Sequence, residues 1–220
     1  MSNVESIWGN EAQTIKTSVN SSGNMNYLKI NDGESKKLRI LGTVTDGLLI
    51  RGWMSFKNDK PFYSTLDQPI NKDDLGLDKY QQPQQVWEFW SVPVWNHFEG
   101  RIQVWEIKQK TIQKALFKLT DPDNINKQWA DWRLYDIEIS FNNNNSPMTK
   151  YTLQPYPPEP ISPSTTVKIT EVLPKVSMDL IFQSKDPLEN IIQEPITNNL
   201  PVMDNRPFID QAEPWKLQQR

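Results

Sequence analysis

Hydrophobic and polar residues alternate along much of the middle of the chain, and this period-two pattern is typical of half-buried β-strands. The segment 86–95 differs, because it is apolar at successive positions and so predicts a strand buried on both faces. Pro93 within this segment favours an edge strand or a bulge. The predicted strands are 37–41, 48–57, 86–95, 101–107, 134–141 and 149–154.

The period changes between 109 and 119. Apolar residues recur there at positions i, i+3, i+4 and i+7, which is the spacing of one face of an α-helix, and lysines follow another side. The apolar set is Ile112, Ala115, Leu116 and Leu119, and the lysines are Lys110, Lys114 and Lys118. We expect one short amphipathic helix in this segment.

The order of these elements is strands, one helix and further strands, without the strand–helix alternation of a parallel sheet. We therefore expect a mainly β fold, in the form of a five-stranded antiparallel barrel with one inserted helix. An OB-fold is the natural candidate, and a small β-sandwich fits the same pattern. The predicted division of the chain is a flexible, partly disordered N-terminal arm, 1–33, a barrel domain, 34–160, and an extended acidic C-terminal tail, 161–220, with room for a short helix.

Composition agrees with a small core between polar flanks. Hydrophobic residues make up 36% of the chain and its mean hydropathy is -0.67, whereas a globular chain has roughly 45–50% apolar residues. The segment 66–85 interrupts the predicted barrel and is polar, contains proline and has no regular period. An insertion of this length in a compact domain is usually functional or unstructured.

The residue inventory excludes several classes of chemistry. Cysteine is absent and His97 is the one histidine, so disulfides and Cys-type zinc sites are excluded. The chain has no Gly-rich phosphate loop and no convincing pair of catalytic carboxylates. We expect no enzymatic activity, no cofactor and no metal. The chain also has no long apolar run and no signal-peptide pattern at its start, which predicts a soluble cytosolic protein without a membrane partner.

Net charge is -3, but the charge is unevenly distributed. Between Lys36 and Lys60 six basic residues stand against two acidic ones, whereas between Ser177 and Pro214 seven acidic residues stand against two basic ones. The net negative charge therefore comes from the C-terminal tail, and the basic N-terminal half is suited to bind a polyanion.

Aromatic and basic residues share the polar face of two predicted strands, Arg51, Trp53 and Lys57 in one and Arg101 with Trp105 in the other. Exposed rings stack on nucleobases, and interleaved cations hold the phosphates. The simpler interpretation is that the rings form a second core face, as we expect for Trp87, Phe89 and Trp90. The predicted stacking residues are Trp53, Trp95, Trp105, Tyr63 and Tyr151, and the predicted phosphate contacts are Arg39, Arg51, Lys57, Arg101, Lys108, Lys110 and Lys150. This pattern predicts a protein that binds single-stranded DNA.

The segment Phe89–Leu119, which contains FWSVPVWNHFEGRIQVWEIKQKTIQKAL, resembles the central hairpin and helix of phage single-stranded DNA-binding proteins with an OB-fold. The phrases YDIEI at 135–139 and TKYTLQP at 149–155 are similar to later strands of that family. The resemblance covers roughly 35–160. It implies an OB-fold, sequence-tolerant binding of single strands during phage DNA replication, recombination or repair, and a location in the cytoplasm of the infected bacterium. The chain departs from the family in lacking a zinc site and a terminal acidic run.

Two other functions fit parts of the pattern. A phage adaptor could use the same barrel to dock on a polymerase or another replication or transcription protein. A carbohydrate-binding module also presents Trp platforms, but it would pair them with amide and acidic side chains. The tail ends in PFIDQAEPWKLQQR, which resembles a docking peptide for replication or recombination proteins. The sequence gives neither the oligomeric state nor a preference between DNA and RNA.

Overall fold

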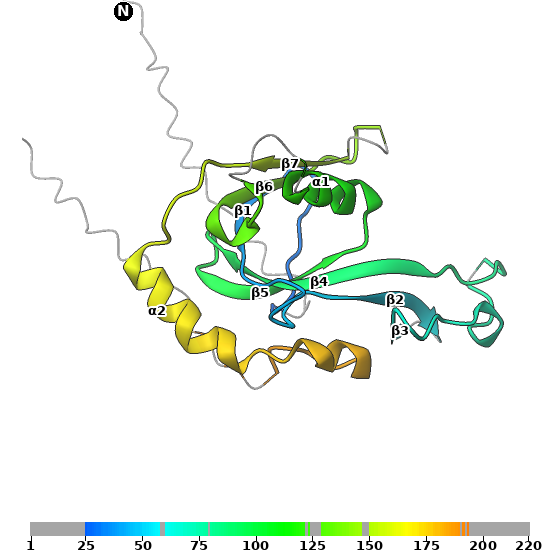
Figure 1. The fold of residues 1–220 in the computed structure, drawn as a ribbon. Helices are drawn as coiled ribbons and strands as arrows, with labels where there is room; N and C mark the ends of the chain where they lie inside the picture. The colour runs from blue at the N-terminus through cyan, green and yellow to red at the C-terminus, as the bar shows by residue number, and fades with distance from the viewer. Residues whose placement is uncertain are drawn as a thin grey trace, which may run out of the picture.

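The computed structural model describes residues 25–57, 60–78, 80–121, 123, 129–146, 150–189, 191 and 193. The fold is mainly β, with an antiparallel sheet of seven strands and few helices (Figure 1). The strands are β1 Ser35–Ile40, β2 Ile50–Lys57, β3 Lys60–Thr65, β4 Trp87–Asn96, β5 Arg101–Ile107, β6 Asp136–Phe141 and β7 Tyr151–Pro155. The α-helices are α1 Lys110–Thr120 and α2 Pro163–Val172, and the 3-10 helices are η1 Lys72–Asp74, η3 Trp132–Leu134, η4 Leu173–Lys175 and η5 Met178–Gln183.

The sheet is organised around β4. The strand order is β3-β2-β4-β1-β6-β7, and β5 pairs with the other edge of β4. The described strands do not close into a barrel, because β5 and β7 form no pair with each other. The predicted antiparallel arrangement is confirmed, and the predicted count of five strands is wrong, since the sheet has seven.

β1 and β2 follow one another along the same edge of β4. Ile40 pairs with Val94 and Ile50 pairs with Ser91, so the intervening loop leaves the sheet opposite Pro93. Proline has no N–H to donate to a neighbouring strand, and it lies where neither β1 nor β2 needs that donor. Pro93 is therefore accommodated at the centre of the sheet and not at an edge.

The third strand, β3, is absent from the sequence prediction. Its sequence, KPFYST, lacks the alternation of polar and apolar residues that marks a strand with one face in the core. In the structure none of its residues is fully buried. The helix prediction is confirmed: α1 buries Ile112 and Leu116, and its Gln113 side chain donates to the carbonyl oxygen of Ile107 at 2.8 Å.

Two apolar clusters hold the fold together, and β4 contributes to both. Trp90, Val92 and Val94 belong to the first cluster, which includes α1, whereas Phe89 and Trp95 belong to the second. The strand is therefore buried on both faces, as its run of apolar residues predicts.

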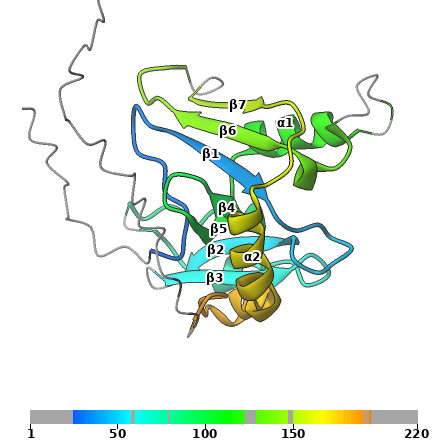
Figure 2. The ribbon, with the colours of Figure 1, turned by 90° about the vertical axis from the view of Figure 1, so that its left-hand side faces the viewer.

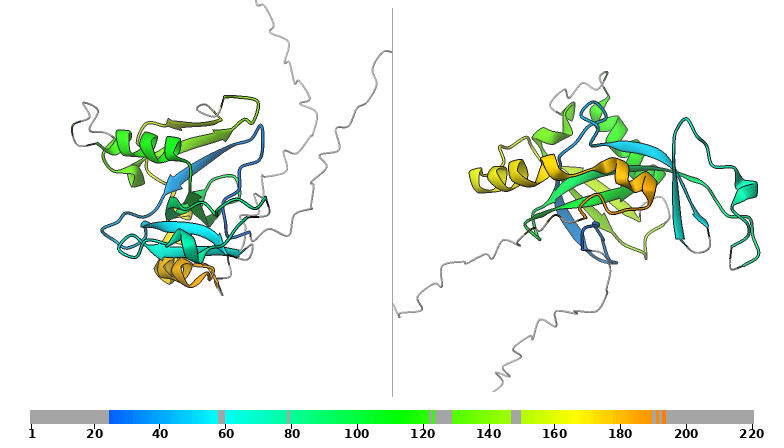
Figure 3. Two further views of the ribbon diagram at one scale, coloured as in Figure 1. Left: turned by 90° about the vertical axis from the view of Figure 1, so that its right-hand side faces the viewer. Right: turned by 90° about the horizontal axis from the view of Figure 1, so that it is seen from below.

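The second cluster is completed by the segment that follows the Pro-rich stretch. Residues in the segment 163–191 contribute a set of buried side chains to it. Figures 2 and 3 show this segment, in yellow and orange, packed against one side of the sheet. The set is Val176, Met178, Ile181 and Leu188. At the other end of the described chain, Tyr27 forms a parallel bridge with Val104 of β5. The packing of the sheet thus extends beyond the 34–160 boundary that the sequence suggests.

Candidate nucleic-acid interface

The β2–β3 hairpin and the first half of β4 form a ribbon that projects beyond the rest of the sheet, and we call residues 50–57, 60–65 and 87–91 the finger (Figure 1). Gly52 allows its strands and η5 to pack closely, because a Cβ there would lie 2.3 Å from the carbonyl oxygen of Ser64 and 2.9 Å from the Phe182 ring. The finger is thus supported from one side by the C-terminal segment.

One face of the finger carries most of its charge. Directly opposite residues of antiparallel strands point to the same face, and Trp53 lies opposite both Ser64 and Glu88, while Lys57 lies opposite Lys60. We call this the basic face, and its residues are Arg51, Trp53, Lys57, Lys60, Phe62, Ser64 and Glu88. The shared face of Arg51, Trp53 and Lys57 that the sequence predicts is confirmed.

The basic face is accessible. The side chain of Arg51 is 43% exposed and Phe62 is 42% exposed, while Trp53 is half-buried. Lys57 and Lys60 are exposed, and neither forms a salt bridge with a described residue. A ring and ammonium groups therefore lie on one surface that is open to solvent.

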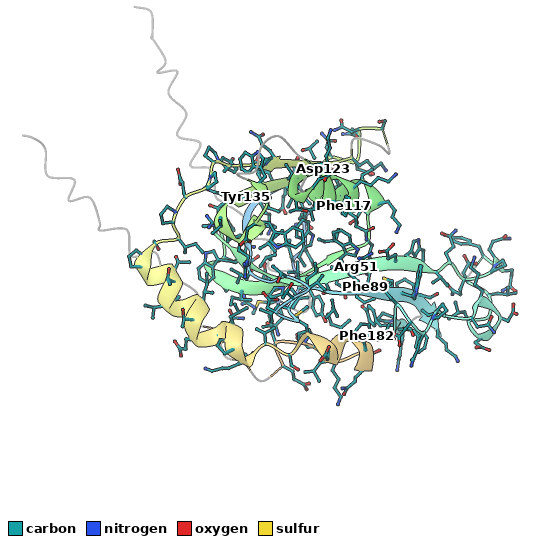
Figure 4. The ribbon with its side chains drawn as sticks, viewed as in Figure 1. Arg51, Phe89, Phe117, Asp123, Tyr135 and Phe182 are labelled. Carbon is teal, nitrogen blue, oxygen red and sulfur yellow. The ribbon has the colours of Figure 1, made fainter. Side chains whose placement is uncertain are left out.

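Glu88 links the basic face to α1. Its Oε1 accepts from Arg51 Nη2 at 2.9 Å, and its Oε2 accepts from Lys110 Nζ at 2.6 Å. The hydrogen bonds that it accepts, above all the one from Lys110, outweigh its partial burial and lower the pKa of Glu88 to about 2. Arg51 also lies over the Trp90 ring, 5.3 Å from its centroid, on the side of the finger away from Phe182 (Figure 4). Lys110 thus adds a fourth cation to Arg51, Lys57 and Lys60, against one carboxylate.

Two of the predicted stacking residues have no exposed ring. Trp95 is 2% exposed and Trp105 is 3% exposed, so the prediction that they present rings to solvent is wrong. Trp105 lies in the first apolar cluster and Trp95 in the second, because both faces of β4 and β5 are covered. Period-two alternation identifies the two faces of a strand, but it does not tell which face another element covers.

The two predicted tyrosines lie away from the basic face. Tyr63 is on the opposite face of the finger, where its hydroxyl donates to Glu106 Oε1 at 2.8 Å. Burial and the negative charge of Glu106 raise the pKa of Tyr63 well above its usual value. Tyr151 lies on β7, at the other end of the strand order from β3, and its ring stacks on Phe141 with centroids 4.7 Å apart.

The predicted phosphate contacts also separate into groups. Arg51 and Lys57 lie on the basic face, and Lys110 adjoins it. Arg101 instead donates to the carbonyl oxygen of Met25 at 2.9 Å, which ties the N-terminal segment to β5. The remaining exposed or half-exposed lysines have short-range partners: Lys108 pairs with Glu106 at 2.9 Å and Lys150 donates to Asn143 at 2.8 Å.

Arg39 is buried, so the prediction that it contacts phosphate is wrong. Its side chain is 3% exposed and its Nε donates to Asp136 Oδ1 at 2.5 Å. The same guanidinium reaches the carbonyl oxygens of Arg133 and Glu159, at 3.2 and 3.0 Å. Arg39 therefore joins β1 to β6, to η3 and to the Pro-rich stretch.

Asp136 is the centre of this buried cluster. Lys37 Nζ lies 3.2 Å from its Oδ2, and Nε2 of His97 lies 3.0 Å from its Oδ1. Burial alone would raise the pKa of the carboxyl, but the hydrogen bonds from His97 and Arg39 prevail and hold the pKa of Asp136 well below its usual value. His97, the one histidine of the chain, thus has a structural role as a hydrogen-bond partner of Asp136.

A groove lies on the opposite face of the finger from the basic face. It has a volume of about 680 Å³ and is lined by Tyr27, Lys29, Phe56, Tyr63, Glu106 and Lys185, among others. This groove also contains rings and lysines, but Glu106 and Asp186 line it as well. Its charge is therefore more balanced than that of the basic face.

Residues 60–64 contribute side chains to the basic face that the sequence reasoning missed. Lys60, Phe62 and Ser64 lie on one face because every second residue of a strand does, but polar and apolar residues do not alternate in this segment. Pro61 in the second position also argues against a strand, because proline is rare within strands.

Comparison of this chain with protein-family models, with curated proteins and with solved structures gave no match. Within the described ranges, no helix is both long and apolar enough to cross a membrane. The same residues contain no group of three or more His, Asp or Glu side chains arranged to hold a metal ion.

Proposed function

We propose that the protein binds single-stranded DNA through the basic face of the finger and that it is a binding protein without catalytic activity. The observation that carries the proposal is the row of Arg51, Trp53 and Lys57 on one accessible strand face. Lys60 and Phe62 extend this row onto the neighbouring strand. A half-buried indole beside ammonium groups that pair with no described carboxylate offers a stacking platform and phosphate contacts within one surface, and neither depends on base sequence.

We also propose that the sheet is an open form of the OB-fold. In this assignment β1 and β2 together form the first strand, β4 and β5 the second and third, and β6 and β7 the fourth and fifth. The pairing of β4 with β1 and β5, the pairing of β6 with β1 and β7, and the position of α1 between β5 and β6 support it. OB-folds are partly open barrels that bind oligonucleotides next to the connection between the first two strands. Here that connection contains β3, and the rest of the finger is formed by the ends of the two strands that it joins.

The biological setting of the proposal comes from the sequence resemblance. It supports a role in phage DNA replication, recombination or repair in the cytoplasm of an infected bacterium. Protection of exposed single strands needs only sequence-tolerant affinity, which is the property that rings and cations on one face supply.

Replacement of Trp53 by alanine tests the proposal. We expect the affinity for a fluorescent oligo-dT to fall by roughly 1–3 kcal/mol, which is the contribution of one stacked base. Fluorescence anisotropy at two salt concentrations measures this, and wild-type affinity should fall as salt rises because bound phosphates release counterions. Phe98→Ala is the matched control, since it removes a ring that is 85% exposed at the β4–β5 turn. Equal affinities for W53A and the wild type, or binding without salt dependence, would contradict the proposal.

Replacement of Glu88 by glutamine should have the opposite effect. Glu88 holds Arg51 and Lys110 through its two carboxylate oxygens, and a DNA phosphate would compete with it for them. We expect E88Q to raise affinity by roughly two- to fivefold at low salt, the size of an exposed ion-pair effect. The control is Glu138→Gln, which removes an equal charge on β6. A loss of affinity in folded E88Q would show that Glu88 positions the cations and does not compete for them.

A further inference from the structure

The insertion at 66–85 folds back against the basic face. Trp53 Nε1 donates to the carbonyl oxygen of Leu66 at 3.4 Å, and the Ser64 hydroxyl donates to the carbonyl oxygen of Gln68. Beyond these contacts the chain enters η1, where the Asn71 side chain accepts from the backbone N–H of Asp73 at 3.2 Å. The insertion is thus fixed at its start by two residues of the finger.

A pocket of about 370 Å³ lies between the insertion and the finger. This volume is at the small end of the range for ligand sites, which is roughly 300–1,000 Å³. The residues on which the inference rests come from both sides of the pocket: Lys57 and Phe62 from the finger, and Gln68, Ile70, Asn71 and Asp74 from the insertion.

The chemistry of this pocket suits a nucleobase. Phe62 contributes an aromatic ring and is 42% exposed, and Ile70 adds an apolar side chain. Lys57 lies at the same pocket and is unpaired among the described residues, so it can hold the phosphate of the nucleotide whose base enters. Asp74 is also a lining residue of the pocket, and its carboxylate accepts no hydrogen bond from a described residue.

Asp74 gives the pocket a preference among bases. A carboxylate only accepts hydrogen bonds, and the exocyclic amino group of cytosine is a donor, whereas thymine has a carbonyl oxygen at the corresponding position. A base with an amino group therefore gains a charge-assisted hydrogen bond, and thymine places an acceptor against a negative charge.

We infer that the 66–85 insertion builds a nucleobase pocket at the end of the basic face, in which Phe62 stacks on the base and Asp74 favours bases with an amino group. This inference rests on the proposed function. It adds a modest base preference to binding that is otherwise sequence-tolerant, and it gives the insertion a role.

The test compares oligo-dC with oligo-dT of about twelve nucleotides, within the usual site size of an OB-fold. We expect the wild-type protein to prefer oligo-dC roughly two- to tenfold, which is the effect of one net hydrogen bond. Asp74→Asn should remove most of this preference, because an amide can also donate to the thymine carbonyl. Phe62→Ala should weaken binding of both oligonucleotides by roughly tenfold, since stacking is lost for either base.

Asp73→Asn is the matched control, because Asp73 is the neighbouring acid of η1 and does not line the pocket. It should keep the ratio of dC to dT affinity of the wild type. Equal ratios in the wild type, D74N and D73N would overturn the pocket while leaving the proposed function intact. Absence of binding to both oligonucleotides at low salt would instead overturn the proposed function itself.

Discussion

Removal of residues 161–220 is expected to abolish cooperative folding of the remaining chain. The truncation uncovers the second apolar cluster, in which Phe89, Ile102 and Val104 are fully buried beneath the C-terminal segment. It also removes four buried apolar side chains, each worth about 1.5–3 kcal/mol of transfer free energy. That sum is comparable to the whole stability of a domain, about 5–15 kcal/mol. Thermal and urea unfolding followed by circular dichroism measure the loss.

Truncation after Gln193 is the control for this prediction. Gln193 donates to and accepts from the backbone of Ile102, at 3.0 and 2.8 Å, and the core residues that the structure describes all precede it. We expect the chain of 1–193 to unfold with the midpoint of the full chain. If the chain of 1–160 unfolded cooperatively at the same midpoint, the C-terminal segment would not be part of the core.

Asp136→Asn should destabilise the fold by about 3–5 kcal/mol at neutral pH. The substitution keeps the shape of the side chain but leaves the buried guanidinium of Arg39 without its counter-charge. Breaking a buried ion pair on one side is costly because the remaining charge stays desolvated. Urea unfolding at pH 7 gives the difference in unfolding free energy. Glu138→Gln on the same strand is the control, and its effect should be smaller because Glu138 has one hydrogen-bond partner, the Tyr156 hydroxyl, in the described part of the chain.

The effect of Asp136→Asn should also depend on pH. The pKa of Asp136 is lower in the folded chain than its usual value of 3.8, so the carboxylate stabilises the fold at pH values above that usual value. This contribution is lost as the pH falls below it, towards the lower folded-state pKa. The difference in stability between wild type and D136N should therefore shrink between pH 5 and pH 3. A difference that stays constant over this range would show that the charge of Asp136 is not its source.

Several features of the fold were predictable from the sequence because they depend on local pattern. The amphipathic repeat of Ile112 and Leu116 identified α1, and the apolar run in β4 identified a strand that is covered on both faces. The shared face of Arg51, Trp53 and Lys57 follows directly from the period of a strand. These features need no knowledge of distant parts of the chain.

Other features depend on contacts between distant residues. Trp53 and Trp105 each share a strand face with an arginine, so the sequence pattern treats them alike. Trp105 is nevertheless buried and Trp53 is half-buried, because α1 and the first apolar cluster cover only Trp105. Arg39 alternates with apolar residues as a solvent-facing cation would, but Asp136, almost a hundred positions away, neutralises it inside the fold. No local pattern contains that partner.

The sequence by itself therefore determined the mainly β class, the helix α1 that follows β5, and the shared face of Arg51, Trp53 and Lys57 on β2. These features depend on period and residue type, which are properties of neighbours along the chain. The tertiary structure alone decided which rings reach solvent, which arginine is buried and how the 66–85 insertion meets the finger. The physical reason is that burial and charge pairing are set by whichever element packs on a face, and that element here comes from far along the chain.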